Sequence, residues 1–465
     1  MKEIPWKDFD PKIQFLAASA RVRPEFMLAY ATAALGGISG IRSSIQGLVG
    51  EERHPALSLL VVPEQPSRTD ALTACVVEPL RAVQDGNRSS NRACGTKLRP
   101  SERLPLGRQA DTMLSELVNS TSDDDGHIRK MREEYAAETR RCLNSAFMIA
   151  PSPASFARLR TELRDGHGLV FDPRARILRE AFGSGKDRLK WQQLLRSISD
   201  GSDFGAEEDS SVRSEVFSSR STQRSPFLFH VSPRQLEQWW DEDLLCHARQ
   251  SAMLLPAAKI PRMKASFIGQ GADAVRHLKG AVREAMDLRY SGKGFRLDCE
   301  FGQLYHKEFF SNVEAFHDRI DNLPESYHSR CHGLMGLPLK LAWTAQLLES
   351  PDKKSIGNYA VAAITAANWC LDQHIELIRA HDEAAEKRKL IQDARRIFAR
   401  IQKKAPCSFR DVYRGTNSQR RSDVEPAVEL LQSENVVTVR GNRIELLEQD
   451  TLPEWLSEVC GSKLN

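Results

Sequence analysis

The 465-residue chain lacks the sequence features that mark secreted proteins, membrane proteins and zinc ribbons. Its nine cysteines form no C-x-x-C pair, so the sequence indicates neither a zinc ribbon nor a disulfide framework. The N-terminal segment MKEIPWKDFD has no apolar signal core. The longest apolar stretch, residues 26–41, is interrupted by glycine and serine and is too short to span a bilayer. We therefore expect a cytoplasmic protein that makes no contact with a membrane.

A turn that follows an apolar strand also lacks the residues that bind phosphate. Residues 58–80, SLLVVPEQPSRTDALTACVVEPL, read as a strand, a polar turn and a helix, which is the setting of the phosphate loop G-x-x-x-x-G-K-[ST]. Pro63 and Arg68 take the places of its glycines, which let backbone N–H groups approach phosphates. Thr69 replaces the lysine that neutralises phosphate charge, and Asp70 replaces the hydroxyl that binds magnesium. The sequence predicts a degenerate phosphate loop and no bound cofactor.

Other short motifs fit turns or packing better than catalytic sites. Asp172 ends the apolar run GLVFD at a degenerate Walker B position, but a proline follows it instead of glutamate, which favours a turn residue. Residues 183–186 (GSGK) follow a helical segment and residues 291–294 (SGKG) lie between helical patterns, so we expect turns at both. His328 and His332 lack the glutamate of the metalloprotease motif and are expected to be packing or surface residues, with no metal bound.

Apolar runs of strand length recur along the first half of the chain and predict a parallel α/β sheet. Most are followed by a turn and a helical pattern, as in strands that a sheet buries on both faces. The runs are residues 59–63, 146–150, 168–172, 227–231 and 252–256. Around them, we expect two helices over 10–42, a polar surface loop over 199–225 and almost wholly helical structure over 262–385.

The last part of the chain has the pattern of a winged helix-turn-helix. A long helical segment precedes residues 408–411, a capping box that opens a short helix ending at Gly415. Residues 422–425 match a second capping box, before the helical segment EPAVELLQSE. Two strand patterns, VVTVR and RIELL, then flank Gly441-Asn442, which is typical of a two-residue hairpin turn.

The charges of this C-terminal region favour contact with DNA phosphates over reading of bases. The net charge of the whole chain, +4, is compatible with a nucleic-acid partner without requiring one. The predicted recognition helix is acidic and suits a phosphate-lined groove poorly. Arginines on either side of it are predicted to hold double-stranded DNA weakly and non-specifically: Arg414, Arg420, Arg421, Arg440 and Arg443. Solvated surface charge around a small packing domain is the alternative interpretation.

In the order of its segments the chain resembles domain-of-unknown-function family 3987, which comprises RecA-like, helicase- or primase-associated proteins of plasmids, prophages and genomic islands. The segments that carry this resemblance, within residues 10–385, are IAPSPASFARLR, GLVFD, LLRSISDG, FLFHVSPRQLEQWW, LLCHARQSAMLLP and LPLKLAWTAQLL. Members typically have a glycine- and lysine-bearing phosphate loop and an Asp-Glu pair after the third strand, and this sequence departs at both. Arg249 resembles an arginine before the family's last core strand. The resemblance implies a RecA-like core that has lost its phosphate chemistry.

These observations predict four regions and leave three functions open. The regions are a helical lead-in (1–50), a degenerate RecA-like core of the P-loop-NTPase type (51–260), a helical domain (261–385) and a winged helix (386–465). One function is a non-catalytic, DNA-associated scaffold or adaptor that acts with another protein in a mobile-element replication, transposition or defence complex. The alternatives are an active helicase-like ATPase with an unorthodox phosphate loop and a purely protein-binding adaptor. The joint loss of both glycines, the lysine and the serine favours the scaffold over the ATPase.

Overall fold

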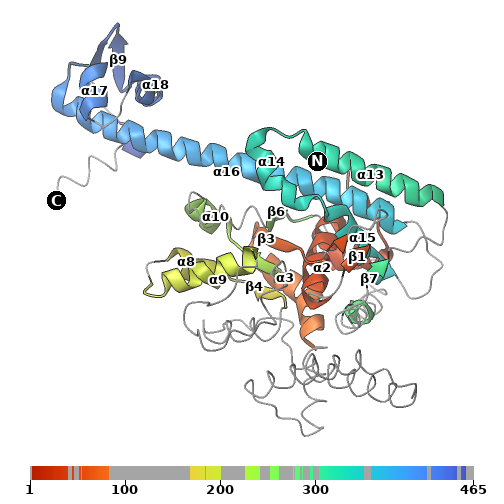
Figure 1. Cartoon of the computed structure of the whole chain (residues 1–465). Helices are drawn as coiled ribbons and strands as arrows, with labels where there is room; N and C mark the ends of the chain where they lie inside the picture. Colours follow the sequence, from red (N-terminus) through yellow and green to blue (C-terminus); the bar gives the residue numbers. More distant parts are fainter. Residues whose placement is uncertain are drawn as a thin grey trace, which may run out of the picture. The chain divides into compact units, whose positions relative to one another are not determined.

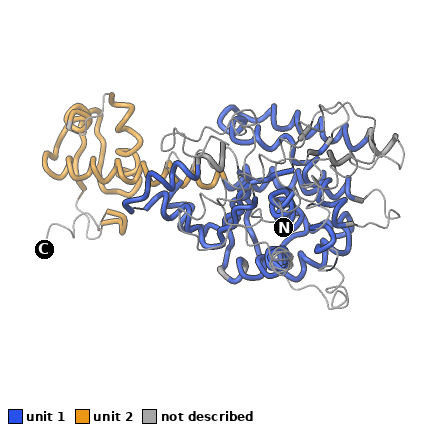
Figure 2. Tube along the Cα trace, turned by 60° about the horizontal axis from the view of Figure 1, so that its bottom comes forward, with its two compact units in different colours: residues 1–377 blue, residues 378–465 orange. Residues whose placement is uncertain are grey.

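The chain forms two compact units, residues 1–377 and residues 378–465, which Figure 2 colours separately. Helix α16, Asn358–Lys404, begins in the first unit and ends in the second. No helix among the described residues has the length and apolarity needed to cross a bilayer. The computed structural model in Figure 1 describes residues 3–39, 44–46, 52–53, 55–82, 168–183, 185–200, 226–240, 252–260, 276, 278–282, 285, 294–296, 303–349, 358–415, 420–447 and 452–456.

The first unit is built around a sheet of four parallel strands in the order β4-β5-β3-β6. The strands lie where the apolar runs predict them: β3 is Ser58–Pro63, β4 Val170–Asp172, β5 Phe227–His230 and β6 Ala252–Ala257. The fifth predicted strand, residues 146–150, lies outside the described residues. Because β3 pairs with β5 on one side and β6 on the other, the turn that follows β3 lies at the middle of the sheet's carboxyl edge.

Both faces of this sheet are buried, which explains why its strands are continuously apolar. Leu59 and Val61 of β3 belong to a core cluster with helix α2, Pro24–Ser39, and helix α15, Leu337–Glu349. The alternate residues Leu60 and Val62 are buried on the opposite face. Figure 1 shows three helices on that other side: α8 (Arg176–Phe182), α9 (Arg188–Asp200) and α10 (Pro233–Trp239).

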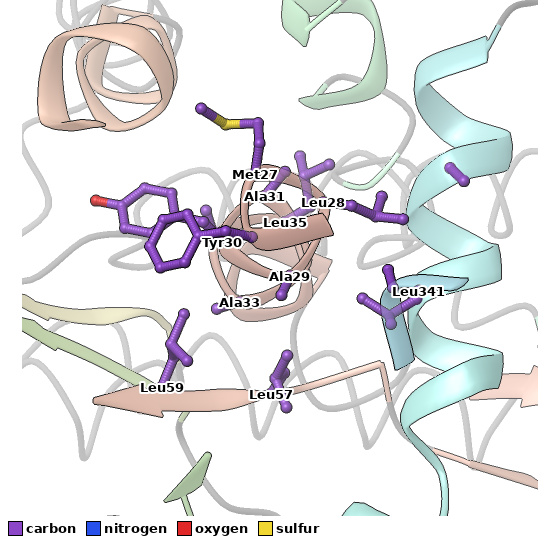
Figure 3. Packing of buried hydrophobic residues seen from close by; sticks show 14 of the residues in the cluster. Met27, Leu28, Ala29, Tyr30, Ala31, Ala33, Leu35, Leu57, Leu59 and Leu341 are labelled. Atoms are coloured by element: carbon purple, nitrogen blue, oxygen red, sulfur yellow. The ribbon is translucent and has the colours of Figure 1, made fainter. Parts of the chain in front are cut away.

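The two N-terminal helices that the sequence predicts are present in the first unit. After the 3-10 helix η1, Trp6–Asp8, come α1, Pro11–Ala20, and α2. Helix α2 is buried on every side, and Figure 3 shows its side chains between β3 and α15. A Cβ on Gly36 would collide with the carbonyl oxygen of Pro55, and one on Gly37 would lie 2.6 Å from the Cβ of Leu169. The two glycines therefore allow close packing within a continuous helix.

The region that follows the sheet is mostly helical. It contains α13 (Gln303–Asp321), α14 (Glu325–Cys331), the 3-10 helix η4 (His332–Leu334), α15 and the first part of α16. A small second sheet interrupts it: β7, Gly294–Arg296, pairs in parallel with β1, Ser44–Gln46, and β1 pairs antiparallel with β2, Glu52–Arg53. The prediction of a turn through residue 294 is wrong, because Gly294 belongs to a strand whose partner lies far earlier in the chain.

The second unit combines the end of α16 with short helices and a three-stranded antiparallel sheet of order β8-β10-β9. Its elements are β8 (Cys407–Ser408), α17 (Phe409–Gly415), the 3-10 helix η5 (Arg421–Asp423), α18 (Glu425–Ser433), β9 (Val437–Arg440) and β10 (Arg443–Leu446). The predicted two-residue hairpin turn is confirmed. Gly441 has a φ of 63° there, which a residue without a side chain adopts easily.

One of the two predicted capping boxes forms. The hydroxyl and backbone N–H of Ser408 donate to Asp411 Oδ2 at 2.6 and 3.0 Å, and the N–H of Asp411 donates back to Ser408 Oγ. The prediction at residues 422–425 is wrong, since α18 begins at Glu425 without a side-chain cap and with a proline in its first turn. The carboxylate of Asp423 instead accepts the N–H of Arg420 at 2.9 Å.

Candidate functional site

The turn between β3 and α3 occupies the position of the predicted phosphate loop. β3 ends at Pro63 and α3, Pro66–Leu72, begins so soon after it that only Glu64 and Gln65 join the two. A phosphate cradle needs several successive backbone N–H donors, and a proline has none. Prolines stand on both sides of this turn. The turn is therefore too short and too poor in donors to wrap an anion.

The other predicted replacements, Arg68, Thr69 and Asp70, all lie within α3. The side chain of Thr69 is buried and that of Asp70 is exposed. In the preceding turn, Glu64 accepts the backbone N–H of Lys259 at 3.2 Å. Carboxylates on both the turn and the first turns of the helix oppose the attraction that a helix N-terminus otherwise has for an anion.

Asp172, at the end of β4, holds the entry to α8. Its Oδ2 accepts the N–H of Ile177 at 2.7 Å and its Oδ1 accepts that of Arg174 at 3.2 Å. Burial raises the pKa of Asp172, and the backbone N–H groups oppose this by favouring the ionised form. Because β5 lies between β4 and β3, Asp172 is not beside Pro63. These contacts fit the interpretation of Asp172 as a turn residue.

A buried polar chain, which sequence reasoning missed, links the sheet to the helix after β3. His230 of β5 shares a 3.0 Å hydrogen bond through Nε2 with the hydroxyl of Tyr30 in α2. The hydroxyl of Thr73, in the π-helix η2 (Thr73–Val77), also interacts with Tyr30. Thr73 donates its own proton to the carbonyl of Thr69 at 2.7 Å. In the hydrogen bond between Tyr30 and His230 either group can be the donor, depending on the tautomer of the imidazole.

The groups in this chain stay neutral near pH 7. Burial lowers the pKa of His230 to about 3 and raises the pKa of Tyr30 well above its usual value. His230 Nδ1 has no hydrogen-bond partner among the described residues. The hydrogen bond therefore joins β5 to α2 through two uncharged side chains. The signal in the sequence was a histidine inside the apolar run FLFHV.

The remaining predicted positions lie in packing or turn surroundings, or outside the described residues. The rings of His328 and His332 are 5.7 Å apart, and His328 Nε2 lies 3.4 Å from Asp321 Oδ1 near the surface. No group of three His, Cys, Asp or Glu side chains converges as metal ligands within the part of the chain that the structure describes. The GSGK segment lies between α8 and α9. Arg249 is outside the described residues.

The two arginines of the hairpin lie directly opposite each other. Arg440 ends β9, Arg443 begins β10, and they are partners in the antiparallel register. Both are exposed, and the alternation of the strands puts them on the face opposite to the buried Val437 and Ile444. Like charges directly across two strands destabilise a sheet, so an anion between these guanidinium groups would relieve a repulsion.

The arginines near α18 have different surroundings. Arg414 and Arg420 are exposed. The guanidinium of Arg421 lies 4.2 Å from the centre of the Phe409 ring, and its Nη2 is 3.1 Å from Glu425 Oε1. Arg421 is thus already engaged by an aromatic face and a carboxylate.

The exposed side of α18 itself is acidic. The helix EPAVELLQS contains no lysine or arginine. Glu429 is exposed along it, and Asp423 and Glu434 are exposed just before and just after it. This surface repels DNA phosphates.

Comparisons with protein-family models, with curated proteins and with solved structures found no match to this chain. Its functional interpretation therefore depends on the geometry described above. That geometry comprises a two-residue turn between prolines, an aspartate that accepts two backbone N–H groups and a pair of opposed, exposed arginines.

Proposed function

We propose that this protein is a non-catalytic, DNA-associated scaffold or adaptor. Its first unit is a RecA-like core that no longer binds nucleotide, and its second unit is a winged helix that holds double-stranded DNA weakly and without sequence preference. The resemblance to domain-of-unknown-function family 3987 implies a place in a mobile-element replication, transposition or defence complex. Another protein of that complex is then its partner, and no cofactor is required.

The observation that carries the proposal is the turn between Pro63 and Pro66. In open parallel sheets, ligands bind at the carboxyl edge where neighbouring strands send their connections in opposite directions. Here the chain leaves β3 toward the β4 side and leaves β5 toward β6, so the crevice between β3 and β5 is that place. The turn that borders it has two linking residues, Glu64 and Gln65, and a proline on each side. A nucleotide would find no cradle for its phosphates there.

The arrangement of both units supports the fold assignments. A strand–turn–helix inside a parallel sheet is where nucleotide-binding α/β folds place the phosphate loop. In the second unit, the end of α16, β8, α17 and α18 precede the β9–β10 hairpin, and β10 pairs with β8. Three helices followed by an exposed hairpin are the parts of a winged helix.

One observation bears on each alternative function: it opposes the ATPase and favours the adaptor. An active ATPase would use Asp172 to hold magnesium, but both oxygens of Asp172 already accept backbone N–H groups. A purely protein-binding adaptor is favoured by the acidic exposed side of α18. DNA binding by the full chain distinguishes this adaptor from the scaffold.

Nucleotide assays on the full chain test the loss of catalysis. We expect no magnesium-dependent ATP hydrolysis and no change of Tm with Mg-ATP, with or without DNA. Asp172→Ala should lower stability by about 1 kcal/mol, because it removes a helix cap, and Asp172→Asn, which keeps an acceptor, should lower it less. Turnover that Asp172→Ala and Asp172→Asn both abolish, in samples that remain folded, would overturn the proposal and favour the ATPase.

A further inference from the structure

Basic side chains gather along the sheet side of the second unit. Arg440 and Arg443 oppose each other at the hairpin tip. On its other side, Arg443 pairs in register with Ser408 of β8. The neighbours of the two arginines at this tip, Gly441 and Asn442, are exposed and uncharged. Arg443 is therefore next to β8, which follows α16, and Arg440 lies one strand further away.

The end of α16 extends this basic surface. Ser408 is hydrogen-bonded to Asp411, and its hydroxyl and N–H, followed by the charges of Lys404 and Arg400, lower the pKa of Asp411. Lys404 and Arg400 are four residues apart on α16, so they share one face of the helix. We define the sheet-side row as Arg400, Lys404, Arg440 and Arg443.

The surface around α18 has the opposite character. Glu429 is exposed on it, and no cation lies on the helix. Arg421, at its entrance, is engaged by Phe409 and Glu425. The exposed side of α18 is therefore acidic, whereas the sheet side carries the four cations of the row beside the carboxylates of Asp411 and Glu445.

We infer that the sheet-side row, and not the exposed face of α18, holds the phosphates of double-stranded DNA. This inference rests on the proposed function and specifies which surface carries out its DNA contact. Guanidinium groups offer forked donors that match phosphate oxygens, and a lysine adds a point charge. The acidic face of α18 then remains turned to solvent or to a protein.

The composition of the row favours DNA over an acidic protein. Protein interfaces combine charged rims with an apolar centre. The positions beside the row include the polar residues Ser408, Thr438 and Asn442 and two carboxylates, Asp411, which Ser408 contacts, and Glu445, on the same strand face as Arg443. The exposed leucines of the second unit, Leu446 and Leu447, follow at the far end of β10. Four cations beside two carboxylates and several small polar groups leave a net positive surface, which suits the sugar-phosphate backbone.

Fluorescence anisotropy with a labelled DNA duplex tests the inference on the full chain. Contacts from four cations give a slope of log K against log salt of about −3.6. Arg440→Ala with Arg443→Ala should reduce the size of this slope by about 1.8 and leave the Tm unchanged or raised. The control is Lys387→Ala with Lys389→Ala, which removes the same charge from exposed positions of α16 and should leave the slope unchanged.

Further variants separate failure of the inference from failure of the proposed function. Glu429→Gln should change the affinity by less than about twofold if α18 faces away from the duplex, and by much more if α18 enters a groove. The inference is overturned if Arg414→Ala with Arg420→Ala lowers the slope as much as the hairpin pair does, or if Glu429→Gln strongly tightens binding. In both cases the proposed function stands. No binding by the unaltered chain at low salt overturns the proposed function itself and favours the protein-binding adaptor.

Discussion

At the scale of single residues, buried histidines couple the stability of the first unit to pH. His374 of α16 accepts the backbone N–H of Leu254, on the edge strand β6, through Nδ1 at 3.0 Å. Burial lowers the pKa of His374 from 6.5 to about 4 and that of His230 to about 3. Between these values and 6.5, the unfolded chain binds protons that the folded chain does not. The contribution of the two neutral histidines to the free energy of unfolding is therefore fully present above pH 6.5. It decreases as the pH falls toward 4.

We expect each histidine to lower the free energy of unfolding by up to about 1.36 kcal/mol per pH unit in this range. His374→Gln keeps an acceptor for the Leu254 N–H but cannot titrate, so it should remove one histidine's part of the slope. His332→Gln, exposed on η4, is the matched control. Urea titrations at about pH 7.5, 6.5 and 5.5 measure the slope. A slope that His374→Gln leaves unchanged would show that His374 does not stay neutral in the folded protein.

At the scale of an element, the two opposed arginines of the β9–β10 hairpin are expected to lower the stability of the hairpin and to strengthen its binding to DNA. Arg440→Glu replaces the repulsion of Arg443 by attraction across the strands, and we expect it to stabilise the hairpin by about 0.2–1 kcal/mol. The same change should reduce the size of the DNA salt slope by about 1. Arg440→Gln removes the repulsion without adding an ion pair. Its Tm should therefore lie between the Tm of the unaltered chain and that of Arg440→Glu. Melting and anisotropy on the same samples measure both effects, and a lower Tm for Arg440→Glu would contradict the opposed register.

Elements could be predicted from the sequence where one local signal was dominant. The continuous apolar runs sufficed for β3 to β6, and Gly441-Asn442 sufficed for the hairpin turn. Competing signals produced the error at residues 422–425, because Pro426 suits a first helical turn and Asp423 has a donor in Arg420. β7 was missed because it is three residues long and pairs with a strand from the N-terminal region.

Part of the candidate site could likewise be predicted from local sequence patterns, and part of it could not. The proline-flanked turn after β3 is a local pattern, and its prolines could be read directly from the sequence. The hydrogen bond between Tyr30 and His230 joins residues 200 positions apart, and no spacing rule indicates it. The place of Ser408 beside Arg443 likewise depends on the pairing of β8 with β10. Contacts between residues that are distant in the sequence cannot be predicted from local sequence patterns.

At the scale of the whole molecule, the two units share helix α16, but on the proposed function nucleotide binding and DNA binding are not coupled through it. In a DNA-dependent ATPase, nucleotide and DNA each change the affinity for the other by the same factor. Helix α16 passes from the first unit into the second and is the covalent path for such coupling. On the proposed function, the turn after β3 holds no phosphate and the first unit has no nucleotide-bound state to transmit. We therefore expect the affinity for duplex DNA to be independent of nucleotide.

Anisotropy titrations of the full chain with Mg-ATP, with Mg-ADP and without nucleotide measure this independence. Nucleotides add anions that weaken any phosphate contact, so the control contains sodium tripolyphosphate at equal ionic strength. The three affinities should agree with this control within about twofold, which corresponds to a coupling free energy near zero. A difference of more than about fivefold between ATP and ADP, at equal ionic strength, would reveal a working nucleotide site. That result would make the helicase-like ATPase the better account, because only a site that distinguishes the two nucleotides can drive one unit through the other.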